Sequence, residues 1–154
     1  MDVIDRKILA LLQAEGRITL TELSRRVQLS VSRCQRRVRD LEAAGVIRAY
    51  RALVDPAMVG FGFEVVAFAT LARPNVVTEF DAALAEVPEI IEAERLFGEP
   101  DYLIRIVAAD RESYQRLYDE VLSKLPGLQG LNSTIVMKQA VTPRPLPLVG
   151  ADRK

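Results

Sequence analysis

Two helix-starting signals stand only eleven residues apart near the start of the chain, and they constrain its fold more than any other feature. The first is Thr19-Leu20-Thr21-Glu22, where the threonine hydroxyl and the glutamate carboxylate can satisfy opposite backbone donors as a capping box. The second is Ser30, a favourable N-cap that follows the link Gln28-Leu29. A short helix, a tight turn and a further helix must therefore follow one another.

One helix precedes the first signal and another follows the second. Asp2 can cap the earlier helix, which ends at Gly16 and has apolar residues at helical spacing: Ile4, Ile8, Leu11 and Leu12. The later helix is predicted from about Val31 to Ala44, where Gly45 stops it because glycine adopts the left-handed conformation at little cost. One face of this helix is apolar and must pack on the two helices before it; it comprises Cys34, Val38 and Leu41.

The opposite face of this later helix is polar and basic. It presents Ser32, Gln35, Arg36 and Arg39, with Arg33 at its edge and Ser30 at its start. A short helix, a tight turn and a helix with such a face form a helix-turn-helix, whose second helix enters the major groove of double-stranded DNA. Arginine and glutamine are the residue types that read guanine and adenine edges. Arg37 lies nearer the apolar face, and we expect it to bridge to acidic residues of a neighbouring helix.

An extended segment follows Gly45. Residues 46–54 are rich in β formers, so a strand or wing is predicted there, and Asp55-Pro56 ends it with a turn. Arg48 and Arg51 on this strand are placed to touch phosphates.

The charge distribution agrees with binding to a polyanion. Residues 1–55 hold eleven basic and seven acidic side chains, a net charge of +4, so the remainder carries −4. Two plainer interpretations stay open on charge alone: ordinary charge scatter, and a three-helix packing domain with a solvated basic face. The caps, the tight turn and the outward arginines together favour DNA binding.

The rest of the chain alternates strands and helices in the order βαββαβ. Strands are expected at 61–72, 89–97, 102–108 and 130–141, with helices at 74–87 and 110–124. This order predicts a ferredoxin-like sandwich, so the expected fold class is α+β. The predicted domains are a winged helix-turn-helix over 1–60 and a ferredoxin-like domain over 61–141. A proline-rich C-terminal segment over 142–154 is expected to serve as a tail or a brace.

The first strand of this domain is apolar on both sides. Val65, Ala67 and Ala69 point one way, while Val66, Phe68 and Thr70 point the other. Helices can cover only one face of the sheet, so we expect a second copy of the chain to cover the other, which makes a homodimer.

The first sixty residues resemble the leucine-responsive and asparagine-responsive (Lrp/AsnC) regulators. The matching elements, at kept spacing, are Asp5-Arg6-Lys7-Ile8-Leu9, Gly16-Arg17, Glu22-Leu23-Ser24, Leu29-Ser30, Arg37-Val38, the run 41–47, Tyr50 and Asp55-Pro56. The resemblance continues more thinly to about residue 140. Arg33 departs from it, because many members have proline there.

The resemblance implies sequence-specific transcriptional regulation that responds to a small effector, an amino acid. It implies that the turn 98–101 and the following Leu103 border the effector site between dimers, and that dimers associate into larger oligomers. Backbone N–H groups that the turn leaves unpaired at Gly98 would bind the carboxylate of the amino acid, and Asp101 would pair with its ammonium group. Ser133 and Thr134 would complete the site. The plainer reading of 98–101 is an ordinary hairpin turn.

Other functions are less favoured. Some tetrapyrrole decarboxylases resemble this family but rely on histidine, and this chain has no histidine. With no expected metal, cofactor or nucleophile-base pair, an enzyme is not predicted. An architectural DNA-compacting protein without an effector is the second alternative. One cysteine, no membrane-length apolar run and an acidic N-terminus predict a soluble cytoplasmic protein without membrane contact.

Overall fold

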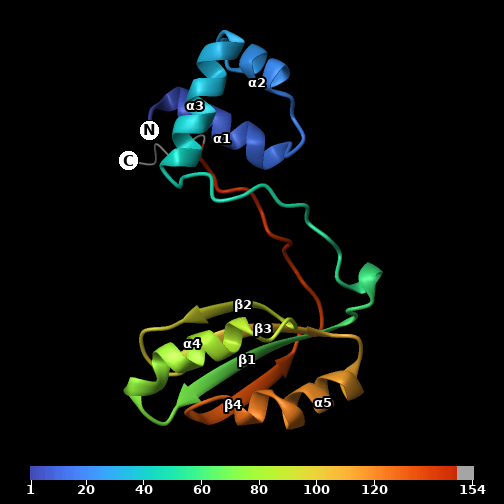
Figure 1. Ribbon diagram of the computed structural model, residues 1–154. Helices are drawn as coiled ribbons and strands as arrows, with labels where there is room; N and C mark the ends of the chain where they lie inside the picture. Colours follow the sequence, from blue (N-terminus) through green and yellow to red (C-terminus); the bar gives the residue numbers. More distant parts are fainter. Residues whose placement is uncertain (149–154) are drawn as a thin grey trace. The chain divides into compact units, whose positions relative to one another are not determined.

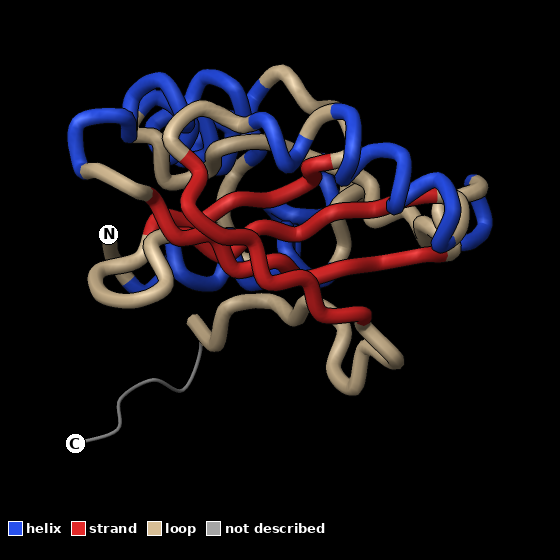
Figure 2. Tube along the Cα trace, turned by 90° about the horizontal axis from the view of Figure 1, so that it is seen from below, coloured by secondary structure: helices blue, strands red, loops and turns tan. Residues whose placement is uncertain are grey.

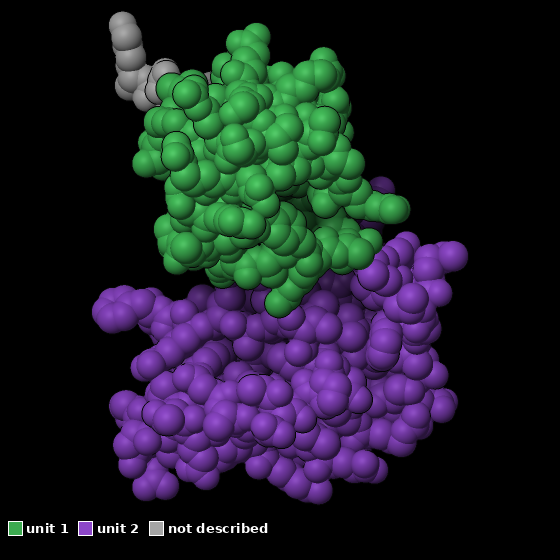
Figure 3. Space-filling model, turned by 45° about the horizontal axis from the view of Figure 1, so that its top comes forward, with its two compact units in different colours: residues 1–53, 141–154 green, residues 54–140 purple. Residues whose placement is uncertain are grey.

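The computed structural model describes residues 1–148, and the chain divides into two compact units (Figure 3). One unit is Met1–Leu53 together with the C-terminal segment from Val141 onward, and the other is Val54–Ala140. The boundary expected at residue 60 therefore falls earlier. Residues 142–148, expected to form a tail or a brace, belong with the N-terminal unit, while 149–154 lie outside the described residues.

The N-terminal unit is built from α1 (Val3–Ala14), α2 (Leu20–Arg26) and α3 (Val31–Ala43), labelled in Figure 1. Each helix begins at a predicted cap: Asp2, Thr19 and Ser30 accept hydrogen bonds from the backbone N–H three residues later. The core between them contains the buried side chains of Ile8, Leu9, Leu23, Val27, Cys34 and Leu41. Burial of these side chains is the main stabilising force for so small a unit.

The reciprocal capping box is found at a different helix from the one predicted. Asp2 and Asp5 exchange both bonds at the start of α1, each at 2.9 Å. At α2 the Thr19 hydroxyl accepts from Glu22 N–H at 3.2 Å, but the Glu22 carboxylate binds Arg25 and Arg26 instead of the cap. Bonds to two guanidinium groups are charge-assisted and stronger than one to a neutral amide, so the box predicted at Thr19 was wrong.

The strand predicted over 46–54 is also wrong. After Ala44 and Gly45, whose φ is +69°, the segment runs without regular secondary structure as far as the η1 turn (Ala57–Val59). Its residues are β formers, but a strand needs a neighbour to pair with, and this segment has no paired strand within residues 1–148. Tyr50 ties it back to α3, because its hydroxyl donates to Glu42 Oε1 at 2.9 Å.

The second unit has the predicted βαββαβ order. Its elements are β1 (Phe63–Leu71), α4 (Val77–Ala85), β2 (Ile90–Arg95), β3 (Tyr102–Ala108), α5 (Arg111–Glu120) and β4 (Leu128–Ile135), with short turns η2 (Pro74–Val76) and η3 (Leu122–Lys124). Within this unit the strands lie in the order β2-β3-β1-β4, all antiparallel, as one continuous layer (Figure 2). The ferredoxin-like α+β fold is therefore confirmed.

Both helices of the second unit cover the same face of the sheet. Phe80 and Leu84 of α4, with Tyr114, Leu117 and Tyr118 of α5, pack on the cluster around Val65, Ala67 and Ala69 of β1. Val66, Phe68 and Thr70 point to the opposite face and are only half-buried. The sheet thus has a helix-covered face and an open face that is partly apolar, as the alternation predicts.

The last strand ends six residues earlier than expected. β4 stops at Ile135, opposite Val65, and only Val136 N–H adds a further bond, to Glu64 O at 2.9 Å. Because β1 begins at Phe63, which this register places opposite Met137, residues beyond Met137 have no partner on that strand. No helix in the described part of the chain is long and apolar enough to cross a membrane.

Candidate DNA-binding surface and effector site

The polar face of α3 is exposed along its length. Cys34 is fully buried and Leu41 is 6% exposed, which fixes the rotation of the helix on the core. The residues predicted to contact DNA therefore all face solvent: Ser30, Ser32, Arg33, Gln35, Arg36 and Arg39. Arg48, on the segment that follows, is exposed as well.

The arginines of this surface differ from Arg25, Arg26 and Arg37 in their partners. Arg25, Arg26 and Arg37 all pair with carboxylates. Within residues 1–148, the arginines of the predicted DNA surface make no such pair: Arg33, Arg36, Arg39 and Arg48. Their positive charge is uncompensated, which suits a surface that meets phosphates and guanine edges.

Arg37 performs the structural role that its position predicts. Its Nη1 donates to Asp2 Oδ2 and to Asp5 Oδ1, each at 2.7 Å, and so joins α3 to the start of α1. The pKa of Asp2 is lowered by the backbone hydrogen bond from Asp5 and then by Arg37, while the two carboxylates raise the pKa of Arg37. A second link, from Arg26 to Glu15, joins α2 to the end of α1. The sequence spacing gave no sign of that second pair.

Asp101, predicted to pair with an effector's ammonium group, is already part of the sheet. Its Oδ2 accepts from the Leu71 N–H at 2.7 Å, its own N–H donates to Ala69 O, and its carbonyl accepts from Leu96 N–H. The side chain thus closes the end of β1, whose pairing with β3 stops at Ala69 and Tyr102. Gly98, in the same turn, is exposed with φ +132°, a conformation that favours glycine.

The other three effector candidates lie on two different faces. Leu103 pairs with Phe68, and Thr134 pairs with Val66, so both project from the open face. Ser133 projects from the helix-covered face. From strand spacing and rise, Ser133 lies more than about 10 Å from Asp101, across β1 and further along the sheet. One chain alone therefore does not bring these five residues into a single pocket.

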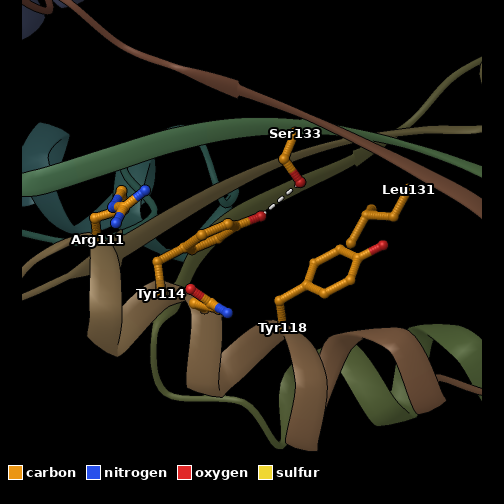
Figure 4. Close-up of a pocket in the computed structure, with 6 residues that line it drawn as sticks. Arg111, Tyr114, Tyr118, Leu131 and Ser133 are labelled. Atoms are coloured by element: carbon orange, nitrogen blue, oxygen red, sulfur yellow. Dashed lines mark hydrogen bonds between the residues drawn. The ribbon is translucent and has the colours of Figure 1, made fainter.

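Ser133 borders a shallow hollow of about 340 Å³ between α5 and β4 (Figure 4). Its Oγ accepts from the Tyr114 hydroxyl at 2.5 Å, and Tyr118 lies beside Leu131 at the other end of the hollow. Burial raises the pKa of Tyr114. Neither tyrosine was predicted as a site residue, although both lie on the face of α5 that turns toward the sheet.

A tyrosine-carboxylate contact joins the start of β3 to α4. The Tyr102 hydroxyl donates to Asp81 Oδ1 at 2.5 Å, and its ring packs on Phe80 with centroids 4.9 Å apart. Burial, followed by the hydrogen bond to Asp81, raises the pKa of Tyr102 to about 12. Within residues 1–148 there is no cluster of His, Cys, Asp and Glu that could hold a metal ion.

Both units of this chain match described protein families. Residues 1–48 match winged helix-turn-helix DNA-binding domains, and residues 64–146, more than half of the chain, match the Lrp/AsnC ligand binding domain. The chain belongs to the Lrp/AsnC family. It is a transcriptional regulator with a helix-turn-helix DNA-binding domain and a ligand-binding domain.

Similarity to other Lrp/AsnC regulators extends over nearly the whole chain. The leucine-responsive regulatory proteins of Haemophilus influenzae and Escherichia coli are each 39% identical to it over 141 residues, which is 90% of this chain and 85% and 86% of the relatives. A transcriptional regulator of Neisseria meningitidis, solved in complex with L-methionine, has a TM-score of 0.90 and 35% identity over 97% of both chains.

Proposed function

We propose that this Lrp/AsnC regulator reads double-stranded DNA with the exposed face of α3. The observation that carries the proposal is the set of uncompensated guanidinium groups on that face, beside an Arg37 that is fully paired. The proposed contacts are Arg36, Gln35 and Ser32 to base edges, with Ser30, Arg33, Arg39 and Arg48 to phosphates. The role is one of binding, not catalysis, and we place the protein in the cytoplasm beside the chromosome.

The test replaces Arg36 with alanine. A base contact from one arginine contributes about 1–3 kcal/mol, so Arg36→Ala is expected to weaken binding to a specific duplex about tenfold or more. Arg36 is exposed, so folding is retained. Arg73→Ala, which removes an exposed arginine from the second unit, is the matched control and leaves affinity unchanged. Equal affinities of the two variants in a gel-shift titration on the protein's own promoter region would contradict the proposal.

We propose further that the second unit binds an amino acid. The family match and the L-methionine complex of the Neisseria relative support this effector class. The candidate residues remain Gly98, Asp101, Leu103, Ser133 and Thr134. Because they lie on two faces of one sheet and β1 separates the turn 98–101 from β4, the proposed site takes the turn 98–101 from one subunit and the β4 residues from another.

Asp101 offers a way to separate the structural and ligand-binding roles of its carboxylate. Asparagine keeps a carbonyl oxygen that can accept from Leu71 N–H, but it removes the charge that an α-ammonium group needs. Asp101→Asn is therefore expected to keep the stability of the sheet and to weaken amino-acid binding at least tenfold.

The measurement is calorimetry with L-methionine and the other common amino acids. Asp119→Asn, an exposed aspartate of α5, is the matched control. If Asp101→Asn binds amino acids as tightly as the parent, the turn 98–101 has no role in ligand binding. If the parent binds no amino acid, the effector proposal fails while DNA binding stands.

We also propose that the open sheet face joins two copies into a homodimer, which associates into larger oligomers. Val66, Phe68 and Leu103 give this face an apolar patch on three neighbouring positions of β1 and β3. Arg105 lies beyond the patch, between Glu64 and Glu92 on the adjacent strands. Apolar side chains surrounded by charged ones are typical of a subunit interface.

A further inference from the structure

The C-terminal segment 141–148, which we call the strap, is part of the DNA-binding unit. The whole ligand-binding unit separates it from Leu53 in the sequence, yet the strap clusters with Met1–Leu53. The chain therefore passes from one unit to the other twice, once after α3 and once after β4. The N-terminal unit is therefore joined to the ligand-binding unit by two covalent connections.

One side chain of α1 recognises the strap through its backbone. The Gln13 Oε1 accepts from the Leu146 N–H at 2.8 Å, and the Gln13 Nε2 donates to the Leu146 carbonyl at 3.5 Å. Pro145 and Pro147 flank Leu146 and have no N–H. Gln13 thus meets the single backbone donor that this stretch of three residues offers.

The strap ends in one apolar anchor. Leu148 N–H donates to Leu146 O at 2.8 Å, which turns the chain so that the half-buried Leu148 packs on the core of the N-terminal unit. The Leu146 side chain itself is 68% exposed, so only its backbone is used. The prolines at 143, 145 and 147 limit the freedom of the released strap and so reduce the entropy lost on docking.

Within residues 1–148 these contacts are few, so the strap belongs to the part of the described fold that opens most easily. A glutamine amide and a leucine hold it, whereas six buried side chains hold the helices. When the strap is released, only the segment after α3, which has no regular structure from residue 46 to 54, connects the helix-turn-helix to the second unit.

We propose that docking of the strap restrains the helix-turn-helix and thereby raises affinity for operators with two half-sites. A restrained pair of recognition helices meets the second half-site at a higher effective concentration, whereas a single half-site is unaffected. The proposal rests on the proposed DNA-binding function. The variant that tests the proposal is Gln13→Ala, which removes both hydrogen bonds between Gln13 and Leu146. Alanine is the best helix former and position 13 is exposed, so α1 itself is retained.

Docking is measured without DNA. The chain has no tryptophan, so Leu146→Trp, at an exposed side chain, gives a single fluorescent reporter on the strap. Adding Gln13→Ala to this reporter is expected to lower its anisotropy, and adding Leu148→Ser is expected to do the same. Gln139→Ala, an exposed glutamine between β4 and the strap, is the matched control and leaves it unchanged. Unchanged anisotropy in Gln13→Ala overturns the docking.

The effect of strap docking on DNA binding is measured as the affinity for two duplexes. One is a duplex with two half-sites, and the other is the same duplex with one half-site scrambled. Loss of the amide contacts is expected to weaken binding to the two-site duplex roughly three- to tenfold and to change the one-site affinity less than about twofold. An equal loss on both duplexes, or no loss on either, overturns the proposal. If the parent binds neither duplex, the proposed function fails, and the anisotropy still decides whether the strap docks.

Discussion

Gly127 is the position where a single methyl group is expected to do most damage. It has φ +69°, and an added Cβ would overlap Val76 Cγ2 and lie 2.8 Å from Val76 Cβ. Its carbonyl also accepts from Ala72 N–H at 2.9 Å, so it joins the residue before β4 to the residue after β1. Gly127→Ala therefore combines an unfavourable backbone conformation with a clash against a half-buried side chain.

The two costs can be separated with matched glycines. Gly45 has the same φ of +69° but nothing within 4 Å of its Cβ position, and Gly16 has neither restriction. The left-handed backbone costs an alanine about 1–2 kcal/mol and overpacking adds about 1–3 kcal/mol. We expect Gly127→Ala to lower the free energy of unfolding by about 2–5 kcal/mol, Gly45→Ala by about 1–2 kcal/mol, and Gly16→Ala by less than either.

The assay is chemical denaturation at fixed protein concentration, because association adds to apparent stability. Of the four tyrosines, only Tyr50 belongs to the N-terminal unit. Gly45 and Gly16 lie in that unit, so their variants are read from Tyr50 emission with the other three tyrosines replaced by phenylalanine. Gly127 lies in the second unit, and in a Tyr50→Phe background tyrosine emission reports on that unit alone. Val76→Ala in the same background should recover at least about 1 kcal/mol of the Gly127→Ala cost in a double-mutant cycle. If Gly127→Ala costs no more than Gly45→Ala, or if Val76→Ala recovers nothing, the steric reasoning is refuted.

Two further predictions concern the second unit. The pKa of Tyr102 is about 12 in the folded chain, above its ordinary value of 10.0, so the stability that this hydroxyl contributes is complete below pH 10 and is lost as the pH rises toward 12. Tyr102→Phe should therefore flatten the decline of stability with pH in alkaline denaturation, and an unchanged pH profile would contradict the assignment. Phe68→Glu places a charge on the open sheet face and should convert the proposed dimer into a folded monomer, as measured by light scattering. Thr78→Glu, at an exposed position of α4, is the control and should leave the dimer intact. If Phe68→Glu is still a dimer, another surface joins the subunits.

The sequence predicts best what local periodicity controls. The angular position of Arg37 on α3 was enough to predict its bridge to acidic residues of a neighbouring helix, because Cys34 and Leu41 fix which face is buried. The alternation of β1 likewise predicted two apolar faces. The bond from Leu71 N–H to Asp101 joins residues thirty apart, and the bonds between Gln13 and Leu146 join residues 133 apart, so no local pattern indicates them.

The errors have a common cause, which is competition for partners. Residues 46–54 have the composition of a strand, yet composition supplies only one half of a pair, and these residues find no partner strand within their own described chain. Glu22 has the position of a capping-box residue, but Arg25 and Arg26 offer it stronger bonds. Such outcomes depend on which competing group is closest in three dimensions, and spacing along the sequence does not give that.

The organisation of the chain limits how a ligand can alter DNA binding. Each unit has a separate, close-packed core, and such cores resist continuous deformation. The connection after α3 has no regular structure over 46–54, so it is poorly suited to carry a rotation from β1 to the recognition helix. A ligand can shift an equilibrium only by binding its two states unequally, and the states that remain are those of subunit association and of strap docking. We therefore expect an effector to change how two recognition helices act together and to leave the contacts of a single α3 with its half-site as they are.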